Sequence, residues 1–300
     1  MTDQADLLAQ FSNALAARAE AAKNTVVAIR LAHERHVTGM VWRSGMVVAS
    51  EQSLPRQDDF GLVAPGGAIL TARIAGRDPS TNIAILKPAE SIAPPTIAAG
   101  EARTGAVALA IGADGTGGAS ARLGLVNLAG SEWHSSRGGL IDRRIVLDVR
   151  LARREEGGPV FDAAGACLGM STFGPRGQVI AIPTATLERV VPQLAKDGRI
   201  ARGWLGVGLQ AVAVPDALRE NADQSGGLMV MSVVENGPAA QAGIVAGDII
   251  LSVDGTPAHR FGKIARHFGA DSIGRKAELR LIRSGAVMTV QTTIAERHAA

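Results

Sequence analysis

The stretch from residue 25 to residue 183 consists of short apolar runs separated by turn residues. The runs are rich in Val, Ile, Leu and Ala, and Gly, Pro and Asp stand between them. Examples are TVVAIRLA, FGLVAP, AILTARIAG, IAILKP, RIVLDVRL and VIAIP. Many short strands with frequent turn signals predict an all-β barrel or sandwich. Hydrophobic periodicity alone does not choose between these two architectures.

The composition limits the class of protein further. Three hundred residues, 46% of them hydrophobic, are enough for two domains, but with six Phe, three Trp and no Tyr their cores must be mostly aliphatic. The net charge of +3 is not gathered in a dense basic block, so no nucleic-acid partner is indicated. No apolar run reaches the roughly 18 residues of a membrane span. No His, Cys and Asp cluster has metal-ligand spacing, so we expect no metal and no cofactor.

Cys167 is the only cysteine, which excludes an intrachain disulfide. Its surroundings, ACLGM, are typical of a buried strand. We therefore expect a packed, small hydrophobic side chain at this position rather than a reactive thiol.

A second domain follows a helix and a linker. Residues 185–197 predict a helix that ends at Gly198, and the basic segment GRIARG, residues 198–203, is interpreted as a linker. In residues 204–297 the strands LGVGLQAV, GLMVMSVV, IILSVDG, AELRLIR and VMTVQTTI surround a helix predicted near residues 259–269.

Three segments resemble the catalytic segments of trypsin-like serine proteases. Residues 45–54, GMVVASEQSL, resemble the strand and turn that carry the catalytic histidine, and residues 76–87, GRDPSTNIAILK, resemble the segment of the orienting aspartate. Residues 154–160, REEGGPV, resemble the nucleophile loop, and residues 237–255, GPAAQAGIVAGDIILSVDG, resemble part of a PDZ domain. With further segments in the same order, nearly the whole chain resembles the HtrA (Deg) group of serine proteases.

This resemblance implies a fold dominated by β-structure. It predicts a chymotrypsin-like double β-barrel over residues 25–197 and a small α/β PDZ domain over residues 204–297. Residues 1–24 are expected to form a helix, because Leu8, Phe11 and three alanine or leucine positions after them make one apolar stripe. We expect this helix to pack on the first barrel. In the family the N-terminal segment often helps assembly, so a contact in a homo- or hetero-oligomer is the alternative.

The three catalytic positions hold Gln52, Asn82 and Glu156 in place of histidine, aspartate and serine. Serine hydrolysis needs a hydroxyl nucleophile, an imidazole base and a carboxylate that orients the base. Gln52 has no group that titrates near neutral pH, and Asn82 cannot stabilise a charged imidazole. Glu156 brings negative charge to the place where the oxyanion forms. We therefore expect a degenerate triad and no enzyme activity.

The replacements have two interpretations. One is drift in a site no longer used. The other is a polar network that closes the old cleft, with Arg153 or Arg154 pairing with a neighbouring glutamate. Arg154 also replaces a glycine of the family loop, which narrows the backbone conformations available there. Ser50 and Ser53 flank Gln52, and a hydrolase rebuilt on other residues remains a minor alternative.

The PDZ domain carries the binding site that the resemblance predicts. PDZ domains bind chain ends by strand addition, with backbone N–H groups around the terminal carboxylate. The matching loop consists of Arg202, Gly203, Trp204, Leu205, Gly206 and Val207. Gly206 allows close backbone approach, and Arg202 adds charge attraction. Phe261, Ile264 and Phe268 on the predicted helix offer an apolar pocket for the terminal side chain, or else some of them belong to the domain core.

These observations lead to a functional hypothesis with two alternatives. The hypothesis is a catalytically inactive HtrA-like pseudoprotease that binds peptides, unfolded segments or protein C-termini through its PDZ domain. The first alternative is a regulatory or scaffold subunit that assembles with an active protease, and the second is a serine-type endopeptidase. Because the N-terminus lacks a basic start and a continuous apolar core, we expect a cytoplasmic protein, or a periplasmic one if a signal was removed.

Overall fold

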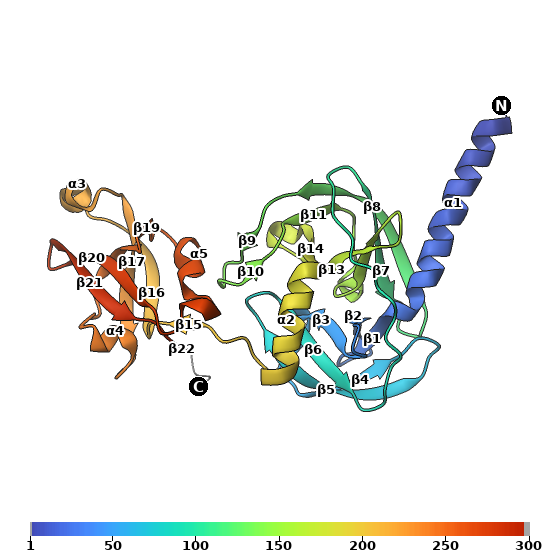
Figure 1. Ribbon diagram of the computed structural model, residues 1–300, viewed down its shortest axis with the longest axis horizontal. Helices are drawn as coiled ribbons and strands as arrows, with labels where there is room; N and C mark the ends of the chain where they lie inside the picture. The colour runs from blue at the N-terminus through green and yellow to red at the C-terminus, as the bar shows by residue number, and fades with distance from the viewer. Residues whose placement is uncertain (1, 297–300) are drawn as a thin grey trace. The chain divides into compact units, whose positions relative to one another are not determined.

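A computed structural model describes residues 2–296. These residues form two compact units. The first consists of residues up to 133 together with 141–200, and the second of residues 134–140 together with 201 onward. Two closed barrels in the first unit and an antiparallel sheet with short helices in the second confirm the expected fold class (Figure 1). No helix among the described residues has both the length and the apolar character needed to cross a membrane.

The first barrel contains six antiparallel strands in the order β1-β2-β3-β6-β5-β4. They are β1 (Val26–Arg30), β2 (His36–Val41), β3 (Val47–Ser50), β4 (Asp59–Val63), β5 (Ile69–Asp78) and β6 (Ile83–Pro88). The sequence of β3 is apolar throughout and does not alternate between apolar and polar residues, and the structure gives the reason. Val47 and Ala49 fill the barrel interior, whereas Val48 points to a second core outside it. Both faces of the strand are therefore buried.

The second barrel repeats this architecture with strands in the order β11-β14-β13-β12-β7-β8. They are β7 (Val107–Ala113), β8 (Ala119–Ala129), β11 (Ile145–Asp148), β12 (Pro159–Asp162), β13 (Cys167–Phe173) and β14 (Val179–Pro183). Two short strands, β9 (Trp133–His134) and β10 (Leu140–Ile141), form a separate two-stranded sheet.

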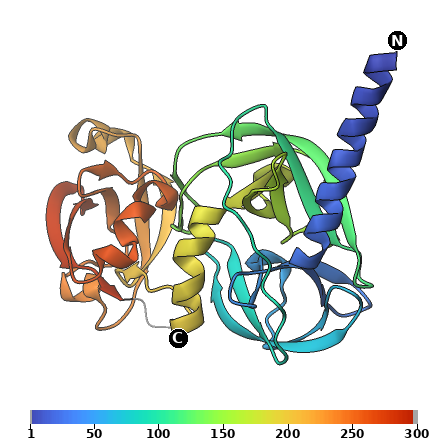
Figure 2. The same cartoon turned by 45° about the vertical axis from the view of Figure 1, so that its right-hand side comes forward.

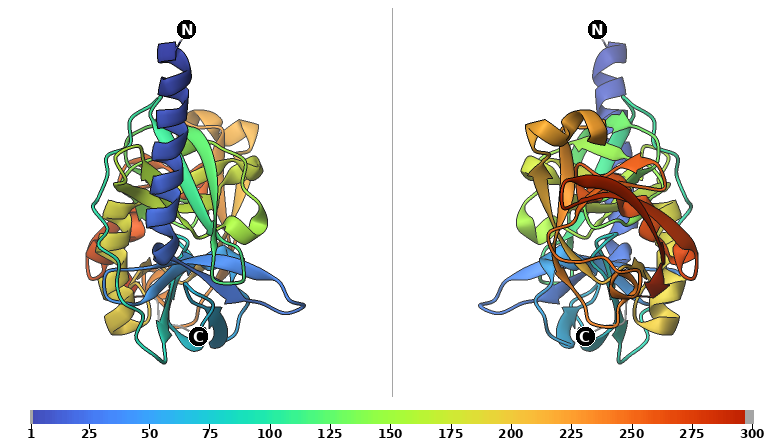
Figure 3. Two further views of the ribbon diagram at one scale, coloured as in Figure 1. Left: turned by 90° about the vertical axis from the view of Figure 1, so that its right-hand side faces the viewer. Right: turned by 90° about the vertical axis from the view of Figure 1, so that its left-hand side faces the viewer.

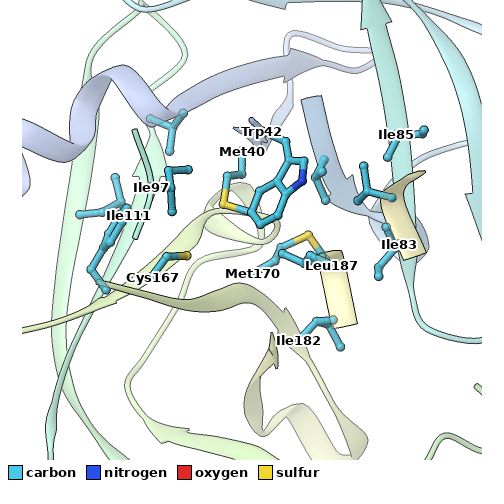
Figure 4. Packing of buried hydrophobic residues seen from close by; sticks show 14 of the residues in the cluster. Met40, Trp42, Ile83, Ile85, Ile97, Ile111, Cys167, Met170, Ile182 and Leu187 are labelled. Carbon is cyan, nitrogen blue, oxygen red and sulfur yellow. The ribbon is translucent and has the colours of Figure 1, made fainter. Parts of the chain in front are cut away.

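One hydrophobic core joins the two barrels. It contains Met40, Trp42, Ile83 and Ile85 from the first barrel and Ile111, Cys167, Met170 and Ile182 from the second, and Figure 4 shows these side chains facing one another. Cys167 is fully buried within this core, as its sequence context predicted. The core fixes the spacing of the barrels, and the polar site described below lies on strands that it holds together.

Helix α2 (Thr184–Asp197) covers both barrels. It contacts β5 and β6 of the first barrel and β13 and β14 of the second, and Figure 2 shows it lying lengthwise against them. Leu187, Val190, Val191 and Leu194 form its buried stripe, with the spacing of one helix face. The helix ends at Gly198, whose φ of 70° is the left-handed conformation that glycine adopts most readily. The predicted helix end is confirmed.

Helix α1 (Thr2–Ala22) differs from the expectation that it packs on the first barrel. Its strand contacts are with β7 and β8 of the second barrel, and Figure 3 shows it extending past the barrels beside β8. Ala19 and Ala22 pack against the core between the barrels. Leu8 and Phe11, at the far end, are 72% and 48% exposed. The sequence pattern did not indicate which barrel the helix contacts, because that depends on the placement of strands distant in the chain.

The second unit contains a five-strand path in the order β16-β17-β18-β20-β21, with β19 paired to β18. The strands are β15 (Gly203–Trp204), β16 (Val207–Ala213), β17 (Gly226–Val233), β18 (Ile249–Val253), β19 (Thr256–Pro257), β20 (Lys276–Arg283), β21 (Ala286–Thr293) and β22 (Ala295–Glu296), and the helices are α3 (Arg219–Ala222), α4 (Pro238–Gln241) and α5 (Phe261–Ile264). Ser284 and Gly285 both have positive φ, which is the two-residue turn that joins twisted antiparallel strands, here β20 and β21. Strand β16 lies at the edge of this sheet.

Candidate functional site

Four backbone segments bring Gln52, Asn82 and Glu156 together. Gln52 lies in a short 3-10 turn directly after β3, and Asn82 lies in the turn that precedes β6. The backbone N–H of Glu51 donates to the carbonyl of Asn82 over 3.2 Å, which ties these two turns to each other. Glu156 follows a second 3-10 turn just before β12, and Thr172 on β13 completes the group. The sequence segments that resemble catalytic segments therefore meet where the barrels face each other.

The Glu156 carboxylate is the centre of a hydrogen-bond network. Its Oε1 atom accepts from Gln52 Nε2 at 2.6 Å, from Thr172 Oγ1 at 2.7 Å and from Ser50 Oγ at 2.9 Å. The backbone N–H of Phe173 donates to the same oxygen over 3.4 Å. Glu156 is only 2% exposed. A buried carboxylate needs such donors because removing a charge from water is costly unless hydrogen bonds replace the lost solvent.

Asn82 connects this network to the first barrel. Its Nδ2 atom donates to Thr172 Oγ1 at 2.8 Å and to Ser50 Oγ at 3.0 Å, and its Oδ1 atom accepts from the Gln52 backbone N–H at 2.8 Å. The φ of Asn82 is +60°, in the left-handed region that asparagine tolerates better than most residues. Asn82 thus adopts the left-handed backbone conformation of this turn and also supplies the side-chain hydrogen bonds to Ser50 and Thr172.

The Gly-Gly-Pro sequence after Glu156 has a structural reason. A Cβ atom on Gly157 would collide with the carbonyl oxygen of Thr38, and one on Gly158 would collide with the carbonyl oxygen of Ile111. The φ of Gly157 is +96°, which other residues rarely adopt. These two glycines let the loop pass close to β2 and β7, and this close passage places Glu156 against the network.

The network interpretation included a pairing of Arg153 or Arg154 with a neighbouring glutamate, and this pairing does not occur among the described residues. Glu155, only 1% exposed, pairs instead with Arg122 of β8, whose Nε lies 2.9 Å from Glu155 Oε1. Burial raises the pKa of the Glu155 carboxyl, but hydrogen bonds from the Ala152 N–H and Arg122 outweigh burial and hold the pKa below its usual value. Arg153 lies over the Phe173 ring, 4.9 Å from its centroid. The pairing of Glu155 with a neighbouring arginine was wrong because the loop turns Glu155 towards β8. Closeness in sequence does not reveal this direction.

The backbone of the same loop forms one turn of 3-10 helix, Arg153–Glu155. The N–H of Glu156 donates to the carbonyl of Arg153 over 3.3 Å, and the carbonyl of Arg154 accepts from Thr38 Oγ1 at 2.8 Å. The loop is therefore closed by its own backbone and by a side chain of β2.

In the second unit, the loop predicted to bind a carboxylate has a distinctive backbone arrangement. The carbonyl of Leu205 accepts from the N–H of Ala239, at 2.8 Å, and the carbonyl of Gly206 accepts from the N–H of Val234, at 2.7 Å. Within residues 2–296, the N–H groups of Leu205 and Gly206 have no backbone acceptor outside the regular strand ladders, and neither residue belongs to a strand. The carbonyl of Leu205 shares a planar trans peptide with the N–H of Gly206, and the carbonyl of Gly206 shares one with the N–H of Val207. Because both carbonyls are bonded within the domain, the N–H groups of Gly206 and Val207 point the opposite way, away from Ala239 and Val234.

The predicted pocket residues differ in exposure. Phe261 on α5 is 40% exposed, whereas Ile264 and Phe268 are buried in the domain core with Leu205. The Phe261 and Phe268 rings are stacked, with centroids 6.3 Å apart. Of the three aromatic and aliphatic side chains, Phe261 is the one that presents a large apolar surface. The pocket role of the other two stays a prediction.

The remaining loop residues lie beside this backbone arrangement. Val207 begins β16 and packs against the core, and Arg202 stands just before β15 with a partly buried side chain. The ring of Trp204 lies next to Gly206, because a Cβ on Gly206 would be 3.2 Å from Trp204 Cη2. Sequence reasoning assigned no role to Thr172, Ala239 or Val234. Their contribution depends on strand register and on long-range backbone contacts, which no local motif signals.

The fold and both sites define a class: a trypsin-like double-barrel protein with a PDZ domain. A family model for the trypsin-like peptidase domain matches residues 37–170, and one for the PDZ domain matches residues 203–294. The chain belongs to the HtrA family, as its sequence segments and the following relatives agree.

Two similar curated relatives carry the same name. A "Probable periplasmic serine endoprotease DegP-like" of Brucella suis is 32% identical over 282 residues, which are 89% of this chain and 54% of the relative. A protein of the same name from Pseudomonas putida is 31% identical over 259 residues, covering 83% of this chain and 53% of the relative. The chain thus spans about half the length of the curated relatives it matches.

Solved structures agree with the fold. A serine endoprotease from Yersinia pestis is 27% identical, covers 95% of this chain and 98% of its own, and superposes with a TM-score of 0.69. The HtrA-type protease AlgW with a decapeptide is 23% identical and superposes with a TM-score of 0.70, covering 95% of this chain and 99% of its own. At that identity the second match supports the fold alone.

Two expectations need correction. The prediction that this chain is not an enzyme is contradicted by the relatives, which are named serine endoproteases and point to an enzyme. That prediction rested on three side chains and gave little weight to a hydrolase rebuilt on other residues. The expected cytoplasmic location is not supported either, because both curated relatives are named periplasmic.

Proposed function

We propose that this chain binds the carboxyl ends of polypeptides through its PDZ domain. The observation that carries the proposal is the orientation of two peptide planes. The carbonyls of Leu205 and Gly206 accept from Ala239 and Val234, which leaves the adjacent N–H groups of Gly206 and Val207 directed outward. Successive outward N–H groups form a concave site for an anion, and PDZ domains use such a site for a terminal carboxylate. Arg202 at the start of this loop adds positive charge.

The rest of a bound peptide would extend the sheet along β16. Edge strands offer unpaired backbone groups to an added strand, and β16 is such an edge. Phe261 presents an exposed ring on α5, which supports a preference for an apolar terminal side chain. Val207 and Leu209, both half-buried, would line the strand side of the groove.

The test compares each peptide as a free acid with the same peptide as an amide. Fluorescently labelled peptides ending in Val, Leu or Phe are titrated with the purified chain, and fluorescence anisotropy gives Kd. Hydrogen bonds to a charged group contribute about 1.5–3 kcal/mol, so amidation should weaken binding roughly 10- to 100-fold. Equal affinity for acid and amide forms would contradict the proposal.

A second candidate function is peptide-bond hydrolysis, and the names of the relatives favour it. We propose an endopeptidase activity on unfolded polypeptides that the PDZ domain recruits. Release of fluorescent fragments from labelled casein, followed over hours with the purified chain, measures this activity directly. A rate no higher than that of casein alone would remove this candidate and leave the binding function.

We also propose that α1 contacts another chain and that the protein is periplasmic. The exposed Leu8 and Phe11 on α1 support a contact with another chain, either a second copy or an active protease in a regulatory complex. Periplasmic relatives favour a periplasmic location. A fusion of alkaline phosphatase, which is active only after export, to the gene in its own cell would test that location.

A further inference from the structure

The endopeptidase activity proposed above requires a group that activates a nucleophile, and the site offers one. Within the network of Ser50, Gln52, Asn82, Glu156 and Thr172, Glu156 is the ionisable side chain. We propose that the Glu156 carboxylate acts as a general base on a water molecule and that the Gln52 amide stabilises the resulting oxyanion. The reaction would then be carboxylate-assisted hydrolysis and not serine-type catalysis. This inference rests on the second proposed function and is independent of binding by the PDZ domain.

The two carboxylate oxygens of Glu156 have different surroundings. Oε1 accepts four hydrogen bonds, from Gln52, Thr172, Ser50 and the Phe173 backbone. Within the described part of the chain no donor is paired with Oε2. Four donors on one oxygen hold the carboxyl group in a single orientation and leave the other oxygen available. A fixed carboxylate with one unpaired oxygen has the arrangement that a general base requires.

The protein's own hydroxyl groups are poor nucleophiles here. Ser50 is fully buried, and its Oγ is shared among Glu156, Thr172 and Asn82. Thr172 is 1% exposed and its Oγ1 donates to Glu156. A substrate carbonyl would have to reach atoms that are buried and already hydrogen-bonded. The proposal therefore assigns the nucleophile to water, which needs less space beside Oε2 than any side chain.

Gln52 has the position that an oxyanion donor needs. The Gln52 residue is exposed as a whole. Its Nε2 atom nevertheless donates to Glu156 Oε1 at 2.6 Å, to Thr172 Oγ1 at 2.9 Å and to the carbonyl of Phe173 at 2.9 Å. An amide group has two hydrogens for these three acceptors. When a substrate binds, Gln52 Nε2 can therefore donate to the substrate carbonyl oxygen in place of the Phe173 carbonyl, so one hydrogen bond replaces another. The new bond strengthens as the oxygen becomes negative, which favours the transition state over the ground state.

The chemical step balances without a further reactant. Glu156 removes a proton from water, the hydroxide oxygen bonds to the substrate carbonyl carbon, and the carbonyl electron pair moves to oxygen. The protonated Glu156 then gives the proton to the leaving nitrogen, the carbonyl forms again and the C–N bond breaks. The products are a carboxylic acid and an amine, and Glu156 is ionised again. Because Glu156 is neutral while the oxyanion exists, its charge does not oppose the intermediate.

The experiment measures casein cleavage by the full chain and by three variants. Glu156→Gln keeps the shape of the side chain and removes the base, so the rate should fall about 100- to 10,000-fold. Gln52→Leu should lower kcat about 100-fold or more with little change in KM. Glu90→Gln changes an exposed glutamate of the same unit and should leave the rate unaltered. Circular dichroism and thermal melting confirm that each variant is folded.

A serine-reactive fluorophosphonate separates the two mechanisms. The expected result is unchanged cleavage and no covalent adduct by intact-mass spectrometry. Cleavage that stops on formation of a serine adduct would overturn the proposal in favour of a serine nucleophile, and full activity in Glu156→Gln would overturn it as well. If the wild type does not cleave casein, both this inference and the second candidate function fail, whereas the amidation experiment still decides the PDZ function. If Glu156→Gln does not fold, the Gln52→Leu result decides, since Gln52 is exposed.

Discussion

Gln52 Nε2 lies 2.6 Å from Glu156 Oε1, and this hydrogen bond joins the first barrel to the second. Asn82 and Ser50 extend the connection on one side, and Thr172 extends it on the other. The side chains at the three positions that resemble a catalytic triad therefore belong to one hydrogen-bond network.

Removal of one member should show how much the network contributes to stability. Thr172→Val removes a donor to Glu156 and an acceptor for Asn82, while the side-chain volume stays nearly constant. Because a buried carboxylate loses a hydrogen bond, the free energy of unfolding should fall by about 1.5–3 kcal/mol. Urea denaturation measures this change. Thr71→Val, at an exposed position on β5, is the matched control and should change stability by less than about 0.5 kcal/mol.

The Glu155–Arg122 pair predicts a loss of stability in acid. The pKa of Glu155 lies below its usual value in the folded chain, so the unfolded chain takes up the proton first as the pH falls. Its contribution is present above roughly pH 4.3, the ordinary glutamate value, and is lost as the pH falls through the lowered pKa. Glu155→Gln should flatten this part of the stability curve, measured by urea denaturation at several pH values. Glu101→Gln, which removes a well exposed partner of Arg143, should leave the curve's shape unchanged.

Cys167 should be inert in the folded chain. Burial raises the pKa of its thiol to about 11, and the side chain is fully buried. Since the thiolate is the reactive form, alkylation by iodoacetamide near neutral pH should be roughly 100-fold slower or more in the native chain than in denaturant. Mass spectrometry follows the reaction. Rapid stoichiometric labelling of the native chain would show that this core opens readily.

Gly206→Ala should weaken peptide binding because it disturbs the backbone of the loop that is proposed to hold the carboxylate. The φ of Gly206 is +79°, and an added Cβ would meet the Trp204 ring at 3.2 Å. Left-handed strain costs about 1–2 kcal/mol for a residue with a Cβ. Gly285→Ala is the matched control, because its φ is +82° and its Cβ would meet nothing within 4 Å. Both variants should lose stability in thermal melts because of the left-handed strain, but only Gly206→Ala should raise Kd for a free-acid peptide, by about 10-fold.

The exposed end of α1 predicts self-association or a partner contact. Leu8 and Phe11 are exposed large apolar side chains, a combination that marks interaction surfaces when such residues gather. The double change Leu8→Asp and Phe11→Asp should reduce the molecular mass measured by sedimentation velocity. Asn13→Asp adds charge to the same helix without removing apolar surface and should leave the mass unchanged. A wild type that sediments as a monomer at all concentrations would rule out self-association.

Much of the fold could be predicted from the chain itself. Short aliphatic runs between turn residues require strands, and the resemblance of ordered segments indicates two barrels and a PDZ domain. Gly198 marks the end of α2 because a left-handed residue terminates a helix, and this is a local property. The buried setting of Cys167 likewise follows from its apolar neighbours on one strand. Such features depend on residues close in sequence, so sequence patterns record them.

The tertiary structure decided which side chains meet. Arg153 and Glu155 are sequence neighbours, yet Glu155 pairs with Arg122 because β8 passes beside the loop. Thr172 joins the Glu156 network through the register of β13, and register over more than a hundred residues leaves no local signal. The sequence by itself determined the three unusual residues at the catalytic positions. Only the fold decided that they join one hydrogen-bond network around the buried Glu156 carboxylate, because hydrogen bonds require ångström-scale placement by elements distant in the chain.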